Sequence, residues 1–149
     1  MAWRVDLAPG GYPLLPALPF RRSVSIRGMT PGELRDYCLS FTGAEETFPF
    51  GANVSVFKVG GKMFALSQLG ADSLQVSLKC EPGLAEALRE AHAAVLPGYH
   101  LNKRHWNTVI VDGSLADDAV RAMIEDSYDL VVSKLPRARR RTLGWRGDA

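Results

Sequence analysis

The stretch NVSVFKVGGKMFALSQLGADSLQVSLK, residues 53–79, decides the fold class. Its first seven residues read as a β-strand with two different faces, with Val54 and Val56 on one face and Ser55, Phe57 and Val59 on the other. Gly60 and Gly61 then suit a two-residue hairpin turn, because glycine adopts positive φ without steric cost. The predicted strands are residues 53–59, 62–69 and 73–79. Consecutive strands joined by short turns pair antiparallel, so this stretch predicts an antiparallel meander.

A helix is predicted just before the meander. Thr30 and Glu33 form a T-x-x-E capping box, and Pro31 between them suits the first helical position. Apolar side chains then recur at helical spacing as far as Phe41, and Gly43 ends the segment. The sequence therefore predicts a helix with one buried face between Thr30 and Gly43.

Two more helices and one more strand are predicted after the meander. The boundaries are Pro82 to Pro97-Gly98 for a second helix, residues 106–111 for a fourth strand, and a Ser114 cap to Leu135 for the last helix. The predicted fold is therefore α+β, with helices packed on an antiparallel sheet in the order α-β-β-β-α-β-α. Because strands and helices do not alternate as βαβ units, the pattern disfavours a doubly wound fold.

Composition limits the class of protein. The chain has 149 residues, of which 46% are hydrophobic and 23% charged, which is typical of one globular domain with its own core. No run of about 20 apolar residues predicts a membrane span, and prolines interrupt the apolar residues 12–20 where a signal peptide would need a helix. Two cysteines, Cys38 and Cys80, are too few for a disulfide scaffold and are typical of a reducing compartment. We therefore expect a cytoplasmic and monomeric protein.

Charge divides the chain into three parts. Residues 1–28 contain four basic residues and one acid (+3), and residues 134–149 contain six basic residues and one acid (+5). Because the whole chain is +2, residues 29–133 carry −6. We interpret residues 1–28 as an extended N-terminal arm, residues 29–135 as the folded domain, and residues 136–149 as a basic C-terminal tail. An acidic body repels nucleic acid unless its few cations converge on one face.

One loop combines histidines, cations, an amide and aromatic rings. Its candidate binding residues are Tyr99, His100, Asn102, Lys103, Arg104, His105 and Trp106. Such side chains can hold an anion or stack on a base. The alternative is structural, with Trp106 at the start of a buried strand, Tyr99 packed on the sheet edge, and the cations solvated. Lys58, Lys62 and Lys79 lie near the ends of predicted strands and would extend this surface if they gather beside the loop.

The C-terminal tail is a second candidate for phosphate binding. Its arginines are Arg137, Arg139, Arg140 and Arg141. Each arginine that neutralises a phosphate adds a salt-dependent increment to the affinity for nucleic acid. The alternative is a solvated terminus that follows the last helix and binds nothing.

The sequence contains no recognisable catalytic or metal-binding motif. His100 and His105 are five residues apart on a loop, and no pair of His or Cys residues at helical i, i+4 spacing supports a metal site. No G-x-S-x-G motif occurs, and neither cysteine has a histidine beside it in sequence. Gly60-Gly61-Lys62 lacks the spacing of a phosphate-binding loop and is better explained as a hairpin turn. We therefore expect no enzyme activity, no cofactor and no bound metal.

Several segments, taken in order, form a recognisable combination. They are Leu34-x-x-Tyr37-Cys38 with Gly43-x-Glu45-Glu46, Phe48-Pro49-Phe50-Gly51, Val56-Phe57-Lys58-Val59-x-Gly61-Lys62-Met63-Phe64-Ala65, Leu78-Lys79-Cys80, Pro97-Gly98-Tyr99-His100-x-Asn102-Lys103-x-His105-Trp106, and Ser127-Tyr128. This combination spans residues 29–135 and resembles the MmcQ/YjbR family of bacterial proteins. The resemblance implies a small domain with a CyaY-like fold. It also implies the family's usual description as predicted DNA-binding, which rests on a sheet that resembles a double-wing motif, and it supplies no catalytic residues.

Three functions remain open from the sequence. The leading hypothesis is a non-enzymatic binding module for nucleic acid or another phosphate-bearing partner, which uses the basic and aromatic surface with help from the tail. The first alternative is a protein-interaction or adaptor domain, which an exposed apolar patch with scattered cations would favour. The second alternative is a small-molecule binder or an uncharacterised enzyme, which requires a pocket lined by His100, His105 and a carboxylate.

Overall fold

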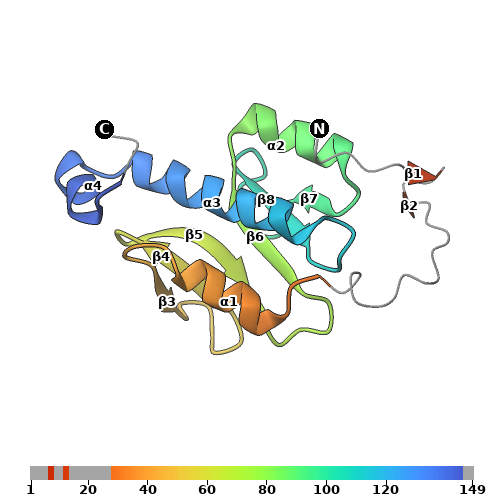
Figure 1. Cartoon of the computed structure of the whole chain (residues 1–149), viewed down its shortest axis with the longest axis horizontal. Coiled ribbons are helices and arrows are strands. Elements are labelled where there is room, and N and C mark those ends of the chain that lie inside the picture. Colours follow the sequence, from red (N-terminus) through yellow and green to blue (C-terminus); the bar gives the residue numbers. More distant parts are fainter. Residues whose placement is uncertain (1–6, 9–11, 14–27, 146–149) are drawn as a thin grey trace.

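The computed structural model describes residues 7–8, 12–13 and 28–145, which form a six-stranded sheet, a separate pair of strands and four helices (Figure 1). The strands of the large sheet are β3 (Glu45–Thr47), β4 (Ser55–Val59), β5 (Lys62–Ser67), β6 (Gln75–Lys79), β7 (Val95–Pro97) and β8 (Trp106–Ile110). They lie in the order β3-β4-β5-β6-β8-β7, and every neighbouring pair is antiparallel. The helices are α1 (Pro31–Leu39), α2 (Pro82–Ala91), α3 (Asp117–Ser133) and α4 (Arg137–Leu143). No helix among the described residues has the length and apolar character needed to cross a membrane.

The N-terminal arm is described at four residues only. β1 (Leu7–Ala8) pairs antiparallel with β2 (Tyr12–Pro13). The rest of the predicted extended arm, up to residue 27, lies outside the described residues.

The predicted α+β class and the antiparallel meander are confirmed, but two helix boundaries are wrong. α2 ends at Ala91, and the residues that the sequence assigned to its last turns form β7, because pairing with β8 satisfies their backbone groups. Ser114 does not cap α3. Its N–H and its hydroxyl both donate to Asp112 Oδ1, at 2.9 and 2.6 Å, and the helix begins only at Asp117.

The predicted loose C-terminal tail is also wrong, since residues 137–143 form α4 and pack on the domain. The side chain of Leu143 occupies the space beside Gly43, which has a φ of +76° and no Cβ to block it. Trp145 donates its indole N–H to Asp129 Oδ1 of α3 at 3.0 Å. Leu143 and Trp145 both pack against the hydrophobic core, which the pattern of an arginine-rich tail did not indicate.

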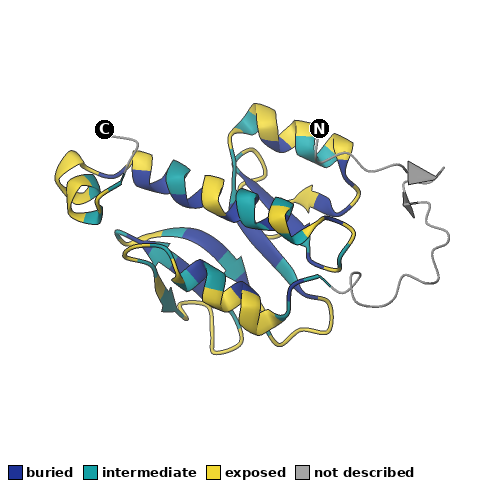
Figure 2. Ribbon diagram, viewed as in Figure 1, coloured by how far each residue is buried: buried dark blue, intermediate teal, exposed yellow. Residues whose placement is uncertain are grey.

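The helices α1, α2 and α3 lie on one face of the sheet (Figure 1). α3 crosses β4, β5 and β6, while α2 covers β7 and β8. The strand side chains on this face form the core, and Phe57, Val76 and Val109 are at most 1% exposed. Figure 2 shows the same arrangement as buried strands behind helices whose outer surfaces are exposed. The opposite face, to which the alternate residues of β5, β6 and β8 point, is called the open face below.

A bulge in β5 brings two consecutive residues into the core. Phe64 is the extra residue that shifts the register between β4 and β5. Phe64 and its neighbour Ala65 are both fully buried in the core cluster. The Phe64 ring lies edge-on to the ring of Tyr128 in α3 with centroids 5.4 Å apart, and Tyr128 stacks on Phe41 at 4.7 Å. These aromatic contacts join the bulged strand to α3 and to the end of α1.

A buried hydroxyl of α3 joins β5 to β6 where their ladder stops. The two strands pair at only two positions, and the ladder ends before Phe64 and Lys79. At this point the hydroxyl of Ser127 donates to Phe64 O at 2.6 Å and accepts from Lys79 N–H at 2.9 Å. Ser127 is fully buried, so water does not replace it as a partner for these backbone groups. β5 and β6 therefore diverge beneath α3 (Figure 1).

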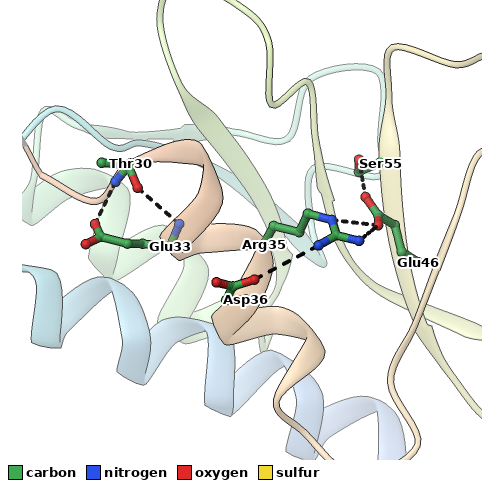
Figure 3. Close-up of polar contacts among 6 residues, drawn as sticks. All are labelled: Thr30, Glu33, Arg35, Asp36, Glu46 and Ser55. Atoms are coloured by element: carbon green, nitrogen blue, oxygen red, sulfur yellow. Dashed lines mark hydrogen bonds and ion pairs between the residues drawn. The ribbon is translucent and has the colours of Figure 1, made fainter.

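The first turn of α1 has the predicted capping box (Figure 3). Thr30 Oγ1 accepts from Glu33 N–H at 3.1 Å, and Glu33 Oε1 accepts from Thr30 N–H at 2.9 Å. Both bonds satisfy N–H groups that the helix itself leaves without partners. The predicted start of the helix is therefore confirmed.

A second polar group in Figure 3 ties α1 to the edge of the sheet. Arg35 Nε and Nη2 each lie 2.8 Å from Glu46 Oε1 of β3, and the hydroxyl of Ser55 in β4 donates to Glu46 Oε2 at 2.7 Å. Burial raises the pKa of the Glu46 carboxyl, but the hydrogen bonds from Ser55 and Arg35 and the Arg35 charge outweigh burial and leave this pKa lowered.

Replacement of Ser127 by alanine tests the bridge between β5 and β6. The substitution leaves Phe64 O and Lys79 N–H without a partner, and we expect the free energy of unfolding to fall by about 2–4 kcal/mol. The matched control is Ser133→Ala in the same helix, whose exposed hydroxyl donates only to Leu130 O within the last turn. Urea denaturation followed by circular dichroism measures both variants, and the control should stay within about 0.5 kcal/mol of the parent protein. Equal losses in the two variants would contradict the role given to Ser127.

The lowered pKa of Glu46 predicts a pH dependence of stability. The unfolded state binds the Glu46 proton at about pH 4.3, and the folded state binds it only at a lower pH. The stabilisation by ionised Glu46 is therefore complete above pH 4.3 and is lost as the pH falls through the folded pKa. Urea denaturation from pH 6 to pH 3 should show a shallower loss of stability in Glu46→Gln than in the parent protein. Parallel curves would rule out this contribution.

Candidate functional site

The structure brings together two groups of cations that are far apart in the sequence. Arg139 of α4 donates to Gly60 O in the turn between β4 and β5, at 3.2 Å. The Leu135 side chain fills the space over Gly60, where a Cβ would stand only 2.7 Å from Leu135 Cδ1. α4 therefore lies beside the tip of the β4–β5 hairpin, at one end of the molecule (Figure 1). The cations gathered at this end, called the basic end below, are Lys58, Lys62, Lys134, Arg137, Arg139, Arg140 and Arg141.

Within residues 28–145, no salt bridge joins an acid to Lys58, Lys62, Lys134, Arg137, Arg139 or Arg141. Among the described residues, the three salt bridges involve only Arg35 and Arg121 as cations. Glu45 faces Lys58 across the β3–β4 pair but forms no salt bridge with it. Arg140 is held differently, with its guanidinium donating to Leu135 O at 2.6 Å. The basic end is therefore a region of concentrated positive charge on a domain whose body is acidic.

The loop from Gly98 to His105 is held firmly to β8. Gly98 N–H donates to Trp106 O at 2.9 Å, and a Cβ at Gly98 would clash with Trp106 Cβ at 2.7 Å. Tyr99 N–H donates to the Thr108 hydroxyl at 3.1 Å. Inside the loop, Asn102 Oδ1 accepts from Arg104 N–H at 2.9 Å. These hydrogen bonds fix the conformation of the loop, and the Asn102 side chain contributes to it.

The predicted residues of this loop point to different places. Tyr99 is 70% exposed and His100 lies beside it, with ring centroids 4.0 Å apart. Trp106 is only 7% exposed, so its ring is not available to stack on a base, and Lys79 Nζ lies 6.0 Å from its centroid. Lys103 and Arg104 are exposed, and the side chain of Arg89 in α2 donates to Lys103 O at 3.1 Å.

The divergence of β5 and β6 separates the predicted cations into two groups. Lys62 begins β5 and belongs with α4 at the basic end, whereas Lys79 ends β6 and packs against Trp106 of β8. Because the two strands part at this end, the ladder does not bring Lys62 alongside Lys79. The basic end and the loop are therefore two separate places on the surface.

The described residues include no obvious catalytic centre. Burial, followed by the nearby Glu46 charge, raises the pKa of the Cys38 thiol to about 12, and burial, followed by Asp126, raises that of Cys80 to about 11. Both thiols are protonated at neutral pH and are poor nucleophiles. No group of three or more His, Cys, Asp or Glu residues in the described part of the chain is arranged to hold a metal ion.

A pocket of about 800 Å³ lies on the open face of the sheet. Its floor is formed by side chains of β5, β6 and β8, namely Leu66, Ser67, Gln75, Ser77 and Thr108. Its rim includes Phe50, Leu96, Tyr99 and His100. The alternative of a small-molecule binder or an enzyme required a pocket lined by His100, His105 and a carboxylate, but neither His105 nor any carboxylate is among the described residues that line this one. The polar strand residues of the floor were missed, because alternating Gln and Ser positions are typical of a solvated strand face.

Comparisons with known proteins agree with the sequence resemblance. The family model described as YjbR matches residues 39–130. The YjbR protein of Escherichia coli K12 is 40% identical over 115 residues, which cover 77% of this chain and 98% of that protein. The YbdF protein of Escherichia coli O157:H7 is 36% identical over 62% of this chain and 76% of that protein. A crystal structure of the Deinococcus radiodurans protein DR2400 superposes with a TM-score of 0.74 at 39% identity, over 83% of this chain and 92% of that one.

Proposed function

The chain belongs to the YjbR family, and we propose that it is a non-catalytic binding module. Its basic end holds a phosphate-bearing polymer, which is a nucleic acid in the first instance. The observation that carries this proposal is the packing of α4 against the β4–β5 hairpin. This packing adds five cations of residues 134–141 to Lys58 and Lys62 at one end of the domain.

The chemistry of the basic end suits a chain of phosphates. Four of its seven cations are arginines of α4, and arginine holds phosphate oxygens through paired N–H donors in a fixed geometry. The cations are spread over a hairpin and a helix, so they suit several phosphates in a row better than a single anion. The acidic body disfavours contact elsewhere, which limits a polyanion to this end.

The loop beside Trp106 plays at most a minor part in this proposal. Trp106 and Lys79 pack on each other, and Lys103 and Arg104 supply two exposed cations on the other side of the diverging strands. These two cations provide a matched control, because they have the same charge as two arginines of α4 but a different location.

Salt dependence of binding tests the location of the site. Fluorescence anisotropy with a labelled duplex DNA and a labelled single strand, over a range of salt concentrations, gives the slope of log affinity against log salt. In Arg137→Ala/Arg141→Ala we expect this slope to become shallower by about 1.4–1.8, since each of the two lost phosphate contacts removes about 0.7–0.9. Lys103→Ala/Arg104→Ala should leave the slope nearly unchanged. An affinity independent of salt, or equal losses in the two double variants, would sink the proposal.

Detachment of α4 tests whether the arrangement of the arginines matters in addition to their charge. Leu143→Ser keeps every cation but removes the side chain that packs beside Gly43. A helix that must be ordered again on binding costs affinity, and we expect a loss of about three- to tenfold. The control is the neighbouring Thr142→Ala, whose exposed hydroxyl donates to Ala138 O within the helix. If trypsin cleaves Leu143→Ser faster at the arginines but DNA binding is unchanged, the packing of α4 is irrelevant to the function.

A further inference from the structure

We infer that the pocket on the open face is a second binding site, which takes a small uncharged molecule with a flat apolar part and at least one hydrogen-bonding group. Its volume of about 800 Å³ lies within the range of about 300–1,000 Å³ that is usual for small-molecule sites. The pocket lies on the face of the sheet opposite α1, α2 and α3, and it does not include the basic end. The inference is therefore independent of the proposed binding of a polyanion.

The charge of the lining indicates an uncharged ligand. None of the described residues that line the pocket is Asp, Glu, Lys or Arg. A charged ligand would lose its hydration here without meeting an opposite charge, which is costly. This neutrality is unusual for the chain, because 23% of its residues are charged. The pocket therefore selects against the anions that suit the basic end.

The polar side chains that line the pocket differ in how far they are engaged. The hydroxyls of Ser67, Ser77 and Thr108 already have partners, since Ser77 Oγ and Thr108 Oγ1 lie 2.8 Å apart and Ser67 donates to Gln75 O at 2.6 Å. The side-chain amides of Gln68 and Gln75 form no hydrogen bond with any described residue. An amide offers both donors and an acceptor, so these two side chains can orient a neutral polar ligand.

The apolar side chains on the rim indicate that part of the ligand is flat and apolar. Among the described residues, the large hydrophobic side chains that are exposed number five, and three of them border this pocket: Phe50 at 63%, Leu96 at 40% and Tyr99 at 70%. Exposed apolar groups that gather around a concave site mark a place of binding. The two rings of the rim present faces on which a planar group can stack.

The backbone of the rim is strained at the same place. His100 has a φ of +59° and is the sole non-glycine residue with positive φ in the described part of the chain. Strained backbone persists where the surrounding structure forces it, and it concentrates at functional sites. The pocket floor is part of that surrounding structure, because the Thr108 hydroxyl accepts the N–H of Tyr99, the residue before His100. This hydrogen bond joins the floor of the pocket to its rim.

A series of three probes with nearly the same shape tests the charge preference. Benzamide is neutral at pH 7, benzoate is an anion and benzylamine is a cation. Each is titrated into the full ¹⁵N-labelled chain, and the amide shifts are followed by NMR. We expect benzamide to shift the amides of residues 66–68, 73–77, 96, 98–101 and 108, and to bind about tenfold or more tightly than either charged probe.

Paired variants tie the binding to this pocket. Leu96→Ser removes an apolar side chain from the rim and should weaken benzamide binding about fivefold, as expected for a partly exposed leucine. Leu84→Ser, at a leucine of α2 that is 46% exposed and lies outside this pocket, should not change it. Gln75→Glu places a negative charge on the floor and should reverse the preference in favour of benzylamine.

Four results would overturn the inference. The first is equal affinity for the three probes, the second is shifts that cluster outside the residues named above, and the third is an equal effect of Leu96→Ser and Leu84→Ser. Absence of binding by all three probes would also reject a small-molecule site and leave the open face to a protein partner. None of these results bears on the salt-dependent binding of DNA, so failure of this site and failure of the proposed function are distinguishable.

Discussion

The Ser127 hydroxyl stands between two strands that no longer pair with each other. In a continued ladder, Lys79 N–H would donate to Phe64 O. Here both groups instead form hydrogen bonds with the Ser127 hydroxyl. Because Ser127 is fully buried on α3, the helix becomes part of the sheet's hydrogen-bonding network and holds β5 and β6 at a fixed divergence. The bulge at Phe64 contributes to the same geometry, since it turns the Phe64 ring toward Tyr128, the residue after Ser127.

This divergence controls where positive charge appears on the surface. One half of the sheet, β3 to β5, carries the hairpin against which α4 packs, and the other half, β6 to β7, carries the loop beside Trp106. If β5 and β6 had continued to pair, Lys62 and Lys79 would lie on adjacent strands at the same end of the sheet. The parted strands instead leave seven cations at the basic end and a smaller pair at the loop. α4 also lies beyond residues 39–130, which the family model matches, so the charge that it supplies is an addition to the matched region.

The two faces of the sheet have different roles. The helix face is closed by the core and the aromatic cluster around Tyr128, and its contribution is stability. The open face has hydroxyls and amides on its strands and exposed apolar side chains on its rim, and none of the described residues that line its pocket is Asp, Glu, Lys or Arg. The pocket and the basic end on this one small domain suit ligands of different chemistry, and because they share no residue they can be tested separately.

The sequence by itself determined the features that depend on local pattern. The capping box at Thr30, the buried face of α1 and the glycine turn at Gly60 all follow from short-range chemistry and periodicity. It also named Lys58, Lys62 and the arginines of α4 as candidates, although it missed Lys134. Only the tertiary structure decided that these groups meet, because α4 is ordered by the contact of Leu143 with Gly43, residues that are distant in sequence. The strands β3 and β7 have three residues each, too few to show a pattern, and they form because a neighbouring strand satisfies their backbone groups. The pocket could not be predicted from the sequence either. Its floor combines Gln75 and Thr108 from separate strands, and the alternation within each strand predicts only a solvated face.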